Sequence, residues 1–229
     1  MATRPVKVVR GKRVRVTRVD DCGEPITDYE ACGYGVSDGF ITVTLTADVE
    51  EGEDITQMNA NGDLCIVDRS RAQTKRWLAE VEFCDVDPGI MSILSNVTLE
   101  TDSEGDVVGI RSVEGSLDGN FALEVWAGTA GTACQNGATF GYLLLPFVAA
   151  GNLGDIEIEN GNTTFTVENA FTQSGSGWGV GPWDVVSDGS APAPLDNPIG
   201  PDDHMLLRLT EVAPPEPFEG CEPIPEPSA

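Results

Sequence analysis

The stretch GFITVTLTA (residues 39–47) alternates apolar and polar side chains along its whole length. Ile41, Val43 and Leu45 share one face, and threonines occupy the other, which is the pattern of a β-strand with one buried face. A second run, Trp77–Val86, alternates in the same way. Because the chain also contains 26 Gly and 15 Pro, with many short runs of Val, Ile and Thr, we expect a mainly β protein with many turns.

Apolar alternation recurs between turn residues in the rest of the chain. The further strands that we expect are Val107–Val113, Phe121–Ala127, Phe140–Phe147, Asp155–Glu159, Thr163–Phe171 and His204–Val212. Asp87-Pro88 places an N-cap residue before a proline suited to the first helical position, which predicts one short α-helix over residues 88–95. About nine strands and one helix predict a β-sandwich or barrel.

Residues 49–75 form a long loop between the two strongest strands. A loop of this length in a compact domain is typical of a functional or interaction segment. We therefore expect three parts: a basic N-terminal arm or first strand over residues 1–18, a single β-sandwich domain over 19–212, and a Pro- and Glu-rich tail over 213–229. The tail's composition predicts disorder before any assembly.

Charge is divided unevenly along the chain. Residues 1–18 hold seven of the 13 basic side chains and none of the 38 acids, and the formal net charge is −25. An acidic body disfavours binding to nucleic acid, whose phosphates require Lys and Arg. Residues 14–19 alternate like a strand, which favours a docking arm or strand over a nucleic-acid arm. A basic arm on an acidic body suits a protein that assembles with its own copies.

Basic side chains in the arm and at the base of the long loop are the candidates for contacts between copies. They are Arg4, Lys7, Arg10, Lys12, Arg13, Arg15, Arg69, Arg71, Lys75 and Arg76. Opposite charges across an interface fix its register and partner more than its affinity. We expect a chain that lacks residues 1–17 to fold but not to polymerise.

The six cysteines include no CxxC pair, so a zinc site is disfavoured. Residues 1–18 lack the apolar core of a secretory signal, which favours synthesis in the cytoplasm and mostly free thiols, several of them buried on strands, over three disulfides. The longest apolar run, Tyr142–Ala150, is too short to span a membrane and contains Pro146.

Residues that carry chemistry are sparse, and we expect no catalytic, cofactor-binding or metal-binding residue and no enzyme. His204 is the single histidine and has no recognisable nucleophile motif around it. Alternate glycines over Gly175–Gly181 lack the helix and lysine of a phosphate-binding loop, so they predict tight aromatic packing. The acidic run at residues 102–106 does not fit the twelve-residue calcium loop.

Taken together, several stretches resemble the major tail protein, or tail-tube protein, of long-tailed phages that infect actinobacteria. These stretches are Val14–Val19 with Asp21-Cys22-Gly23, DGFITVTLTAD (38–48), VEFCDVDP (81–88), FALEVWAG (121–128), GYLLLPF (141–147), GSGWGVGPWDVV (175–186) and DHMLLRL (203–209) before Ala213-Pro214-Pro215. Their order and spacing cover most of the chain from residue 13 to 215.

The resemblance implies a β-sandwich subunit with a flanking helix and no active site. Six copies form a ring, and rings stack into a hollow tube around a tape-measure protein, with tail terminator and baseplate proteins at its ends. Phage DNA passes through the lumen without specific binding. The protein is then a component of the virion tail, assembled in the bacterial host's cytoplasm. A long hairpin loop and a terminal arm bridge successive rings, and residues 49–75 and 1–17 fit these roles by position.

Two other functions stay open. One is another virion component, either a capsid decoration protein or a tail-completion protein. The other is a monomeric acidic β-sandwich module that binds sugar or calcium, with Trp126, Trp178 and Trp183 as a platform for the sugar.

Overall fold

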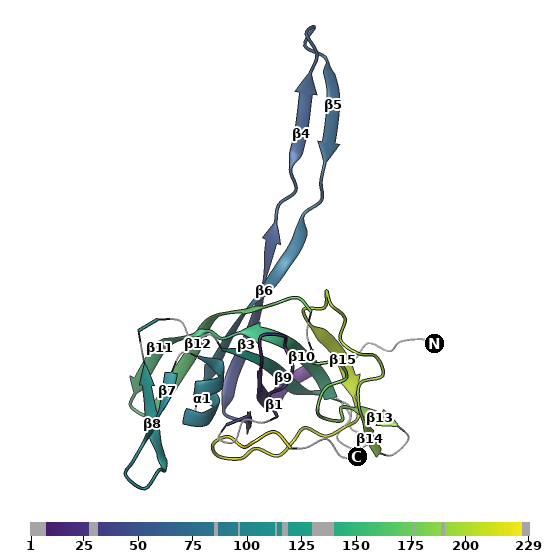
Figure 1. Ribbon diagram of the computed structural model, residues 1–229. Helices are drawn as coiled ribbons and strands as arrows, with labels where there is room; N and C mark the ends of the chain where they lie inside the picture. Colours follow the sequence, from purple (N-terminus) through teal and green to yellow (C-terminus); the bar gives the residue numbers. More distant parts are fainter. Residues whose placement is uncertain are drawn as a thin grey trace.

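The computed structural model describes residues 8–27, 32–84, 87–95, 97–112, 114–115, 119–129, 140–175, 177–188 and 191–225. A strand-rich body carries one long two-stranded arm that projects away from it (Figure 1). The elements are β1 (Val8–Val19), β2 (Tyr34–Ser37), β3 (Phe40–Glu50), β4 (Asp54–Met58), β5 (Leu64–Arg69), β6 (Gln73–Phe83), α1 (Pro88–Leu94), β7 (Val97–Thr101), β8 (Val107–Ser112), β9 (Asn120–Thr129), β10 (Phe140–Ala149), β11 (Asn152–Glu159), β12 (Asn162–Thr172), β13 (Val186–Asp188), β14 (Ala191–Ala193) and β15 (Leu206–Thr210).

The body is built on one nine-stranded antiparallel sheet. Its main path runs β2-β1-β9-β10-β12-β6-β3, with β11 paired to β12 and β15 paired to β10. Three two-stranded sheets, β4-β5, β7-β8 and β13-β14, complete the described strands. The expectation of a mainly β protein with one short helix is confirmed for the described residues. These strands do not close into a barrel.

Both faces of the sheet's centre are buried, which explains the nearly continuous apolar runs of β9 and β10. From β9, Phe121 and Leu123 enter a cluster that includes the whole buried face of α1. Ala122 and Trp126 of the same strand face a second cluster, which the segment around Trp178 covers from the other side. Each fully buried side chain of this size contributes about 1.5–3 kcal/mol to folding.

Helix α1 begins where the sequence predicts. The Asp87 side chain accepts hydrogen bonds from the backbone N–H groups of Gly89 (2.8 Å) and Ile90 (3.2 Å), and Pro88 takes the first helical position. Such a cap supplies partners for amides that have none inside the helix. The helix ends at Leu94, and residues 89–94 are all buried, so the predicted span of 88–95 is confirmed to within one residue.

Of the two alternatives for residues 1–18, an arm or a first strand, the structure shows the strand, β1, from Val8 onward. It lies inside the sheet, between β2 and β9, and Val14 and Val16 are fully buried. A chain without residues 1–17 therefore loses most of a central strand, so we no longer expect it to fold. The alternation of residues 14–19 was a correct signal for a strand, but both faces of that strand are covered, because Thr17 is buried as well. Residues 1–7 lie outside the described part of the chain.

Strand β3 departs from the predicted alternation at its start. A bulge between Phe40 and Thr42 shifts the register against β6, so Phe40 packs against the core while Ile41 is left exposed. Val43 and Leu45 contact the core as predicted. The Phe40 ring lies over Gly11 of β1, where a Cβ atom would come within 2.4 Å of the ring. The bulge thus lets an aromatic ring use the space that a glycine leaves open.

A buried ion pair links β1 to β9. Arg15, directly opposite Glu124 in the strand register, donates to it through Nε (2.5 Å) and Nη2 (2.6 Å), and the Tyr142 hydroxyl donates to the same carboxylate (2.6 Å). The guanidinium lies over the rings of Trp183, 3.9 Å from its centroid, and Trp126. Bidentate geometry, a third hydrogen bond and two aromatic faces compensate for the desolvation of both charges.

Burial first, and then the neighbouring Glu124 carboxylate, raise the pKa of Tyr142 well above its ordinary value of 10.0. The unfolded chain loses this proton near pH 10, whereas the folded protein holds it to higher pH. The contribution of Tyr142 to the free energy of unfolding is therefore complete below pH 10 and is lost as pH rises through the folded pKa. We expect a loss of up to about 1.4 kcal/mol per pH unit from this group, measured by urea unfolding from about pH 9 to 11, and a shallower slope in Tyr142→Phe. Equal slopes in the two proteins would contradict this assignment.

The cysteines and the C-terminal tail also differ from expectation. Cys22, Cys65 and Cys84 are free, as predicted for most of the cysteines, but they are exposed where burial on strands was expected for several. Cys32 and Cys221 form a disulfide, which the prediction disfavoured. Cys134 lies outside the described residues. Residues 213–225 are ordered against the body, because the disulfide and backbone hydrogen bonds to β2 hold them. Among the described residues, no helix is long and apolar enough to cross a membrane.

Candidate functional site: the hairpin arm and the sheet edges

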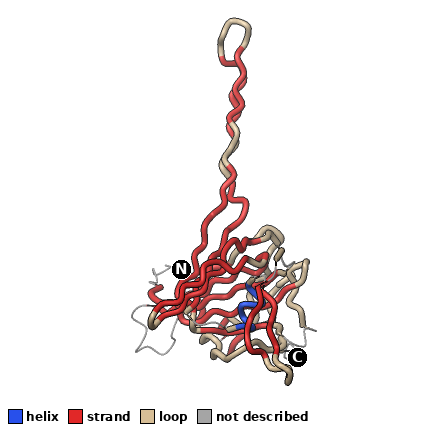
Figure 2. The backbone as a smooth tube through the Cα atoms, turned by 90° about the vertical axis from the view of Figure 1, so that its left-hand side faces the viewer, coloured by secondary structure: helices blue, strands red, loops and turns tan. Residues whose placement is uncertain are grey.

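The predicted long loop, residues 49–75, is a β-hairpin that extends the β3-β6 pair. We call residues 51–72 the arm. β3 and β6 pair as far as Glu50 and Gln73, and β4 and β5 then pair from Asp54–Arg69 to Met58–Leu64. Figures 1 and 2 both show the arm as a narrow ribbon that rises well clear of the body. The prediction of a long, separate segment is confirmed, and the segment has the hairpin form that the resemblance assigns to it by position.

Polar contacts at both ends give the arm its shape. At the tip, the Asn59 side chain accepts hydrogen bonds from the backbone N–H groups of Asn61 and Asp63, both at 2.9 Å, and Gly62 adopts a positive φ of 87°. Such a turn suits Asn and Gly, which adopt these backbone angles at low cost. Lower down, the backbone at Gly52 passes so close to Ser70 that a Cβ atom would lie 2.0 Å from the Ser70 carbonyl oxygen. Only glycine fits at that position.

Every residue of β4 and β5 is exposed, including the large apolar ones. These side chains are between 46% and 65% exposed, and they are Ile55, Met58, Leu64, Ile66 and Val67. The strand register places Gln57 opposite Ile66 and Thr56 opposite Val67, so both faces of the ribbon carry apolar groups. An isolated two-stranded hairpin is only marginally stable in water. Exposed apolar side chains on both faces, with no body beneath them, make the arm a candidate surface for contact with a partner.

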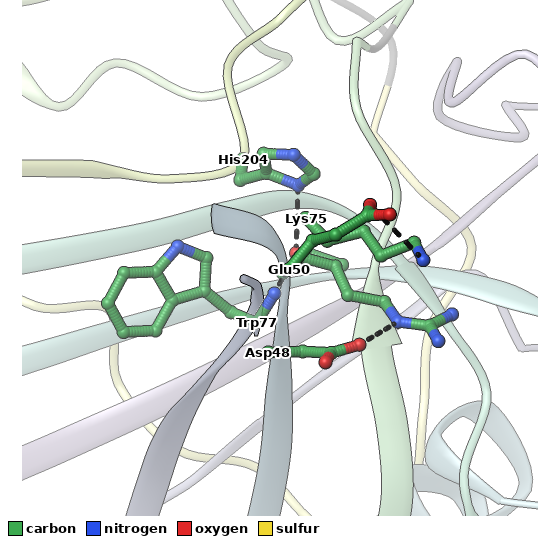
Figure 3. A network of polar contacts seen from close by, with 7 residues as sticks. Asp48, Glu50, Lys75, Trp77 and His204 are labelled. Carbon is green, nitrogen blue, oxygen red and sulfur yellow. Dashed lines mark hydrogen bonds and ion pairs between the residues drawn. The ribbon is translucent and has the colours of Figure 1, made fainter. Parts of the chain in front are cut away.

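The base of the arm is held by charged and polar groups (Figure 3). Arg76 pairs with Asp48 across the strands at 2.8 Å, and Lys75 lies 3.6 Å from Glu50. Thr172 of β12 accepts a hydrogen bond from the backbone N–H of Trp77 and contacts Nδ1 of His204 at 2.9 Å. His204 is therefore placed in a structural network at the base of the arm.

The predicted basic contact residues do not gather in one place. Arg69, Lys75 and Arg76 pair with acids within the hairpin, whereas Arg71 is exposed and has no ion-pair partner among the described residues. Arg15 is 4% exposed and is bound inside the subunit, so it offers no surface to another copy.

On β1, Arg10 and Lys12 are exposed. Arg13 binds Asp38 at 3.1 Å. Arg4 and Lys7 lie outside the described residues.

A second candidate surface is the free edge of β15. This strand pairs with β10 and with no other described strand. Leu207 and Leu209 lie opposite Leu143 and Gly141 of β10 and are 74% and 43% exposed. A free strand edge with exposed apolar side chains is a template for pairing with another chain. At one end of the main path, β3 likewise pairs only with β6 among the described strands.

Two of the three tryptophans proposed as a sugar platform lie in the core. Trp126 and Trp178 are buried, and the second packs against Trp183 with ring centroids 5.9 Å apart. Gly181 admits the Trp178 ring, since a Cβ there would lie 2.4 Å from Nε1, so the predicted aromatic packing of this glycine-rich segment is confirmed. The carboxylates of the acidic run 102–106 gather within 4.8 Å at the exposed β7-β8 turn, where Asp102 caps backbone N–H groups.

The sequence did contain signals for two features that pattern reasoning missed. Glu124 is the one charged residue in the apolar stretch 121–128, and an acid on a buried strand requires an oppositely charged partner. Arg15 lies between two valines of an alternating strand pattern. Ile55–Met58 and Leu64–Val67 flank an Asn- and Gly-rich turn at a spacing typical of a hairpin.

Comparisons with known proteins give no independent assignment. No protein-family model matches the chain, and no curated protein sequence matches it.

Proposed function

We propose that this chain is a structural virion protein of the tail-tube type, a β-sandwich subunit that polymerises as stacked hexameric rings into the hollow tube through which phage DNA is delivered. The observation that carries the proposal is the arm, whose apolar side chains are exposed on both faces at a distance from the body. The number of six copies per ring and the location in the virion are taken from the sequence resemblance to tail-tube proteins.

The arm suits contacts between successive rings. It leaves the body as a ribbon of two strands, so it reaches a neighbour without moving the sheet that carries it. Docking would bury Ile55, Met58 and Leu64, and would order a hairpin that is marginal alone. The surface it meets on the next copy differs from the arm itself. Such a head-to-tail contact does not close on itself, and repeated along an axis it builds a tube.

The sheet edges suit contacts within a ring. β15 and β3 are edges at separate places on the same sheet, and pairing β15 of one copy with β3 of the next would continue the sheet around a ring. Repetition of one such contact closes by rotation. Leu207 and Leu209 would become buried in that junction.

Charge fits a conduit for DNA. A net charge of −25 per subunit repels phosphate, so DNA passes through the lumen without specific binding. Arg10, Lys12 and Arg71, which are exposed, are the basic groups available to offset repulsion between acidic neighbours. The partners are further copies, the tape-measure protein, and tail terminator and baseplate proteins, with assembly in the host bacterial cytoplasm and no role for a membrane, a cofactor or catalysis.

A paired substitution tests the ring contact. Leu207→Lys with Leu209→Lys places charges on an exposed edge, so we expect the free energy of unfolding to change by less than about 1 kcal/mol. Sedimentation velocity should show assembly shifted to at least about tenfold higher concentration, because a charge would be buried at each junction.

The control is Ile156→Lys with Ile158→Lys on β11, another exposed strand edge, which should assemble like the wild type. If the β11 variant failed to assemble while the β15 variant assembled normally, the ring contact would involve β11 and not β15. Trimers, or single rings that do not stack, would favour a capsid decoration or tail-completion protein instead.

A further inference from the structure

The C-terminal segment 213–225, which we call the strap, lies along the outer edge of β2. Glu222 exchanges backbone hydrogen bonds with Tyr34 at 2.9 Å in both directions, and its carbonyl also accepts from the N–H of Gly33 at 2.8 Å. Four residues earlier, the N–H of Phe218 donates to the carbonyl of Val36 at 3.3 Å. The strap thus pairs with the sheet edge through an isolated antiparallel β-bridge between Tyr34 and Glu222.

The groove beneath the strap is made by glycines. A Cβ atom on Gly33 would lie 2.8 Å from the backbone nitrogen of Ile224, and one on Gly89 would lie 2.8 Å from Sγ of Cys221. Gly33 precedes β2 and Gly89 is in the first turn of α1, so two distant segments leave room for one peptide. Asp87 joins them: one carboxylate oxygen caps α1, and the other accepts from the backbone N–H of Gly220 at 2.6 Å.

Few side chains hold the strap in this groove. Ile224, at 4% exposure, is its single buried residue among those described. Phe218 packs edge-on against Tyr34, with centroids 5.3 Å apart, but stays partly exposed. Backbone hydrogen bonds at a solvent-exposed edge open readily when so little apolar surface is buried. Two exposed side-chain contacts, Tyr34 to Glu222 at 3.2 Å and Arg13 to Glu216 at 4.0 Å, add little in water. The disulfide between Cys32 and Cys221 is the covalent link between the strap and the body.

We propose that the Cys32–Cys221 disulfide is a redox-controlled clasp, which fixes the strap in its groove when oxidised and lets it detach when reduced, while the sheet stays folded. Cys32 is buried and Cys221 is partly exposed, so a reducing thiolate attacks Sγ of Cys221 and Cys32 leaves as the thiolate. A second thiol then releases Cys221. In the closing direction, two protein thiols reduce one glutathione disulfide to two glutathione thiols, which take up both protons.

The clasp is a property of the single subunit and does not depend on the proposed assembly. The strap brings Cys221 to the start of α1, and Cys32, just before β2, lies at the same point. Cys22, Cys65 and Cys84 are exposed and unpaired, so they serve as internal controls.

Hydrogen exchange measured by mass spectrometry on the full chain tests the clasp. After reduction with excess dithiothreitol, we expect amides in the strap and in residues 33–36 to exchange at least tenfold faster, with β9 amides unchanged. Cys221→Ser should show the fast exchange without reductant, and Cys84→Ser should behave as the wild type. Re-oxidation with glutathione disulfide should restore protection in the wild type and in Cys84→Ser.

Three results would overturn the proposal. Strap exchange that is the same before and after reduction would mean that the other contacts hold the strap. Faster exchange throughout β9 would mean that the bond stabilises the whole fold instead of the strap. A wild-type dimer that non-reducing peptide mapping shows to be joined through Cys32 of one copy and Cys221 of the other would mean that the strap closes on a second copy.

Discussion

A chain in which residues 51–72 are replaced by Asn-Gly is expected to fold normally, to form rings and to form no tubes. Glu50 and Gln73 are a register pair, so a two-residue turn connects β3 to β6 without strain. Every residue of β4 and β5 is exposed, and none belongs to either core cluster, so the free energy of unfolding should change by less than about 1 kcal/mol.

The effect on stacking should be large. If docking buries about half of the exposed surface of the arm's five apolar side chains, each contributes about 1 kcal/mol. The sum of about 5 kcal/mol corresponds to roughly several thousandfold in the concentration needed for stacking. Electron microscopy and sedimentation velocity on the same samples separate rings from tubes. A matched control replaces only Asp102–Asp106 at the exposed β7-β8 turn with a turn of equal length, which should leave tube growth intact. Tubes of normal length without the arm would contradict its role between rings.

Removing the charge of Arg15 should destabilise the isolated subunit by about 3–5 kcal/mol, because Arg15→Ala leaves Glu124 as an unpaired charge in the core. Glu124 is 1% exposed and receives two hydrogen bonds from Arg15 and one from Tyr142. Urea unfolding monitored by tryptophan fluorescence measures the change, and Trp126 and Trp183, which face the guanidinium, report on the same site.

Two further variants define what the pair does. Arg10→Ala, on an exposed position of the same strand, should alter stability by less than about 0.5 kcal/mol. Replacing both partners by apolar residues, as Arg15→Met with Glu124→Leu, should recover much of the loss, since no charge is then left unpaired. A loss below about 1 kcal/mol in Arg15→Ala would show that the ion pair is not desolvated as its geometry indicates.

Local patterns predicted the elements well where one residue type fixes the backbone. Asp87 and Pro88 gave the start of α1 to the residue, and the alternation over residues 77–86 placed Ala79, Val81 and Phe83 in the core. The predicted strand limits were less accurate, since β3 runs on to Glu50 and β6 starts at Gln73. In this part both faces of the two strands are exposed, so apolar alternation stops, but the strands continue because they pair with each other.

Tertiary context decided what the patterns could not. The basic residues of β1 suggested a free arm, yet Arg15 is neutralised by Glu124, which lies far away in the sequence and adjacent in the sheet. The Pro- and Glu-rich tail suggested disorder, yet Cys221 ties it to Cys32. For the candidate site, the sequence located the long segment at residues 49–75, but not its strand pairing or the free edge of β15, which depend on what other strands leave uncovered.

The measurement that tests the central proposal most directly is negative-stain electron microscopy of the purified, untagged full-length protein over a range of concentrations. We expect hollow tubes, or six-fold rings with a central channel, at high concentration. Uniform monomers or trimers without a channel at every concentration would contradict it.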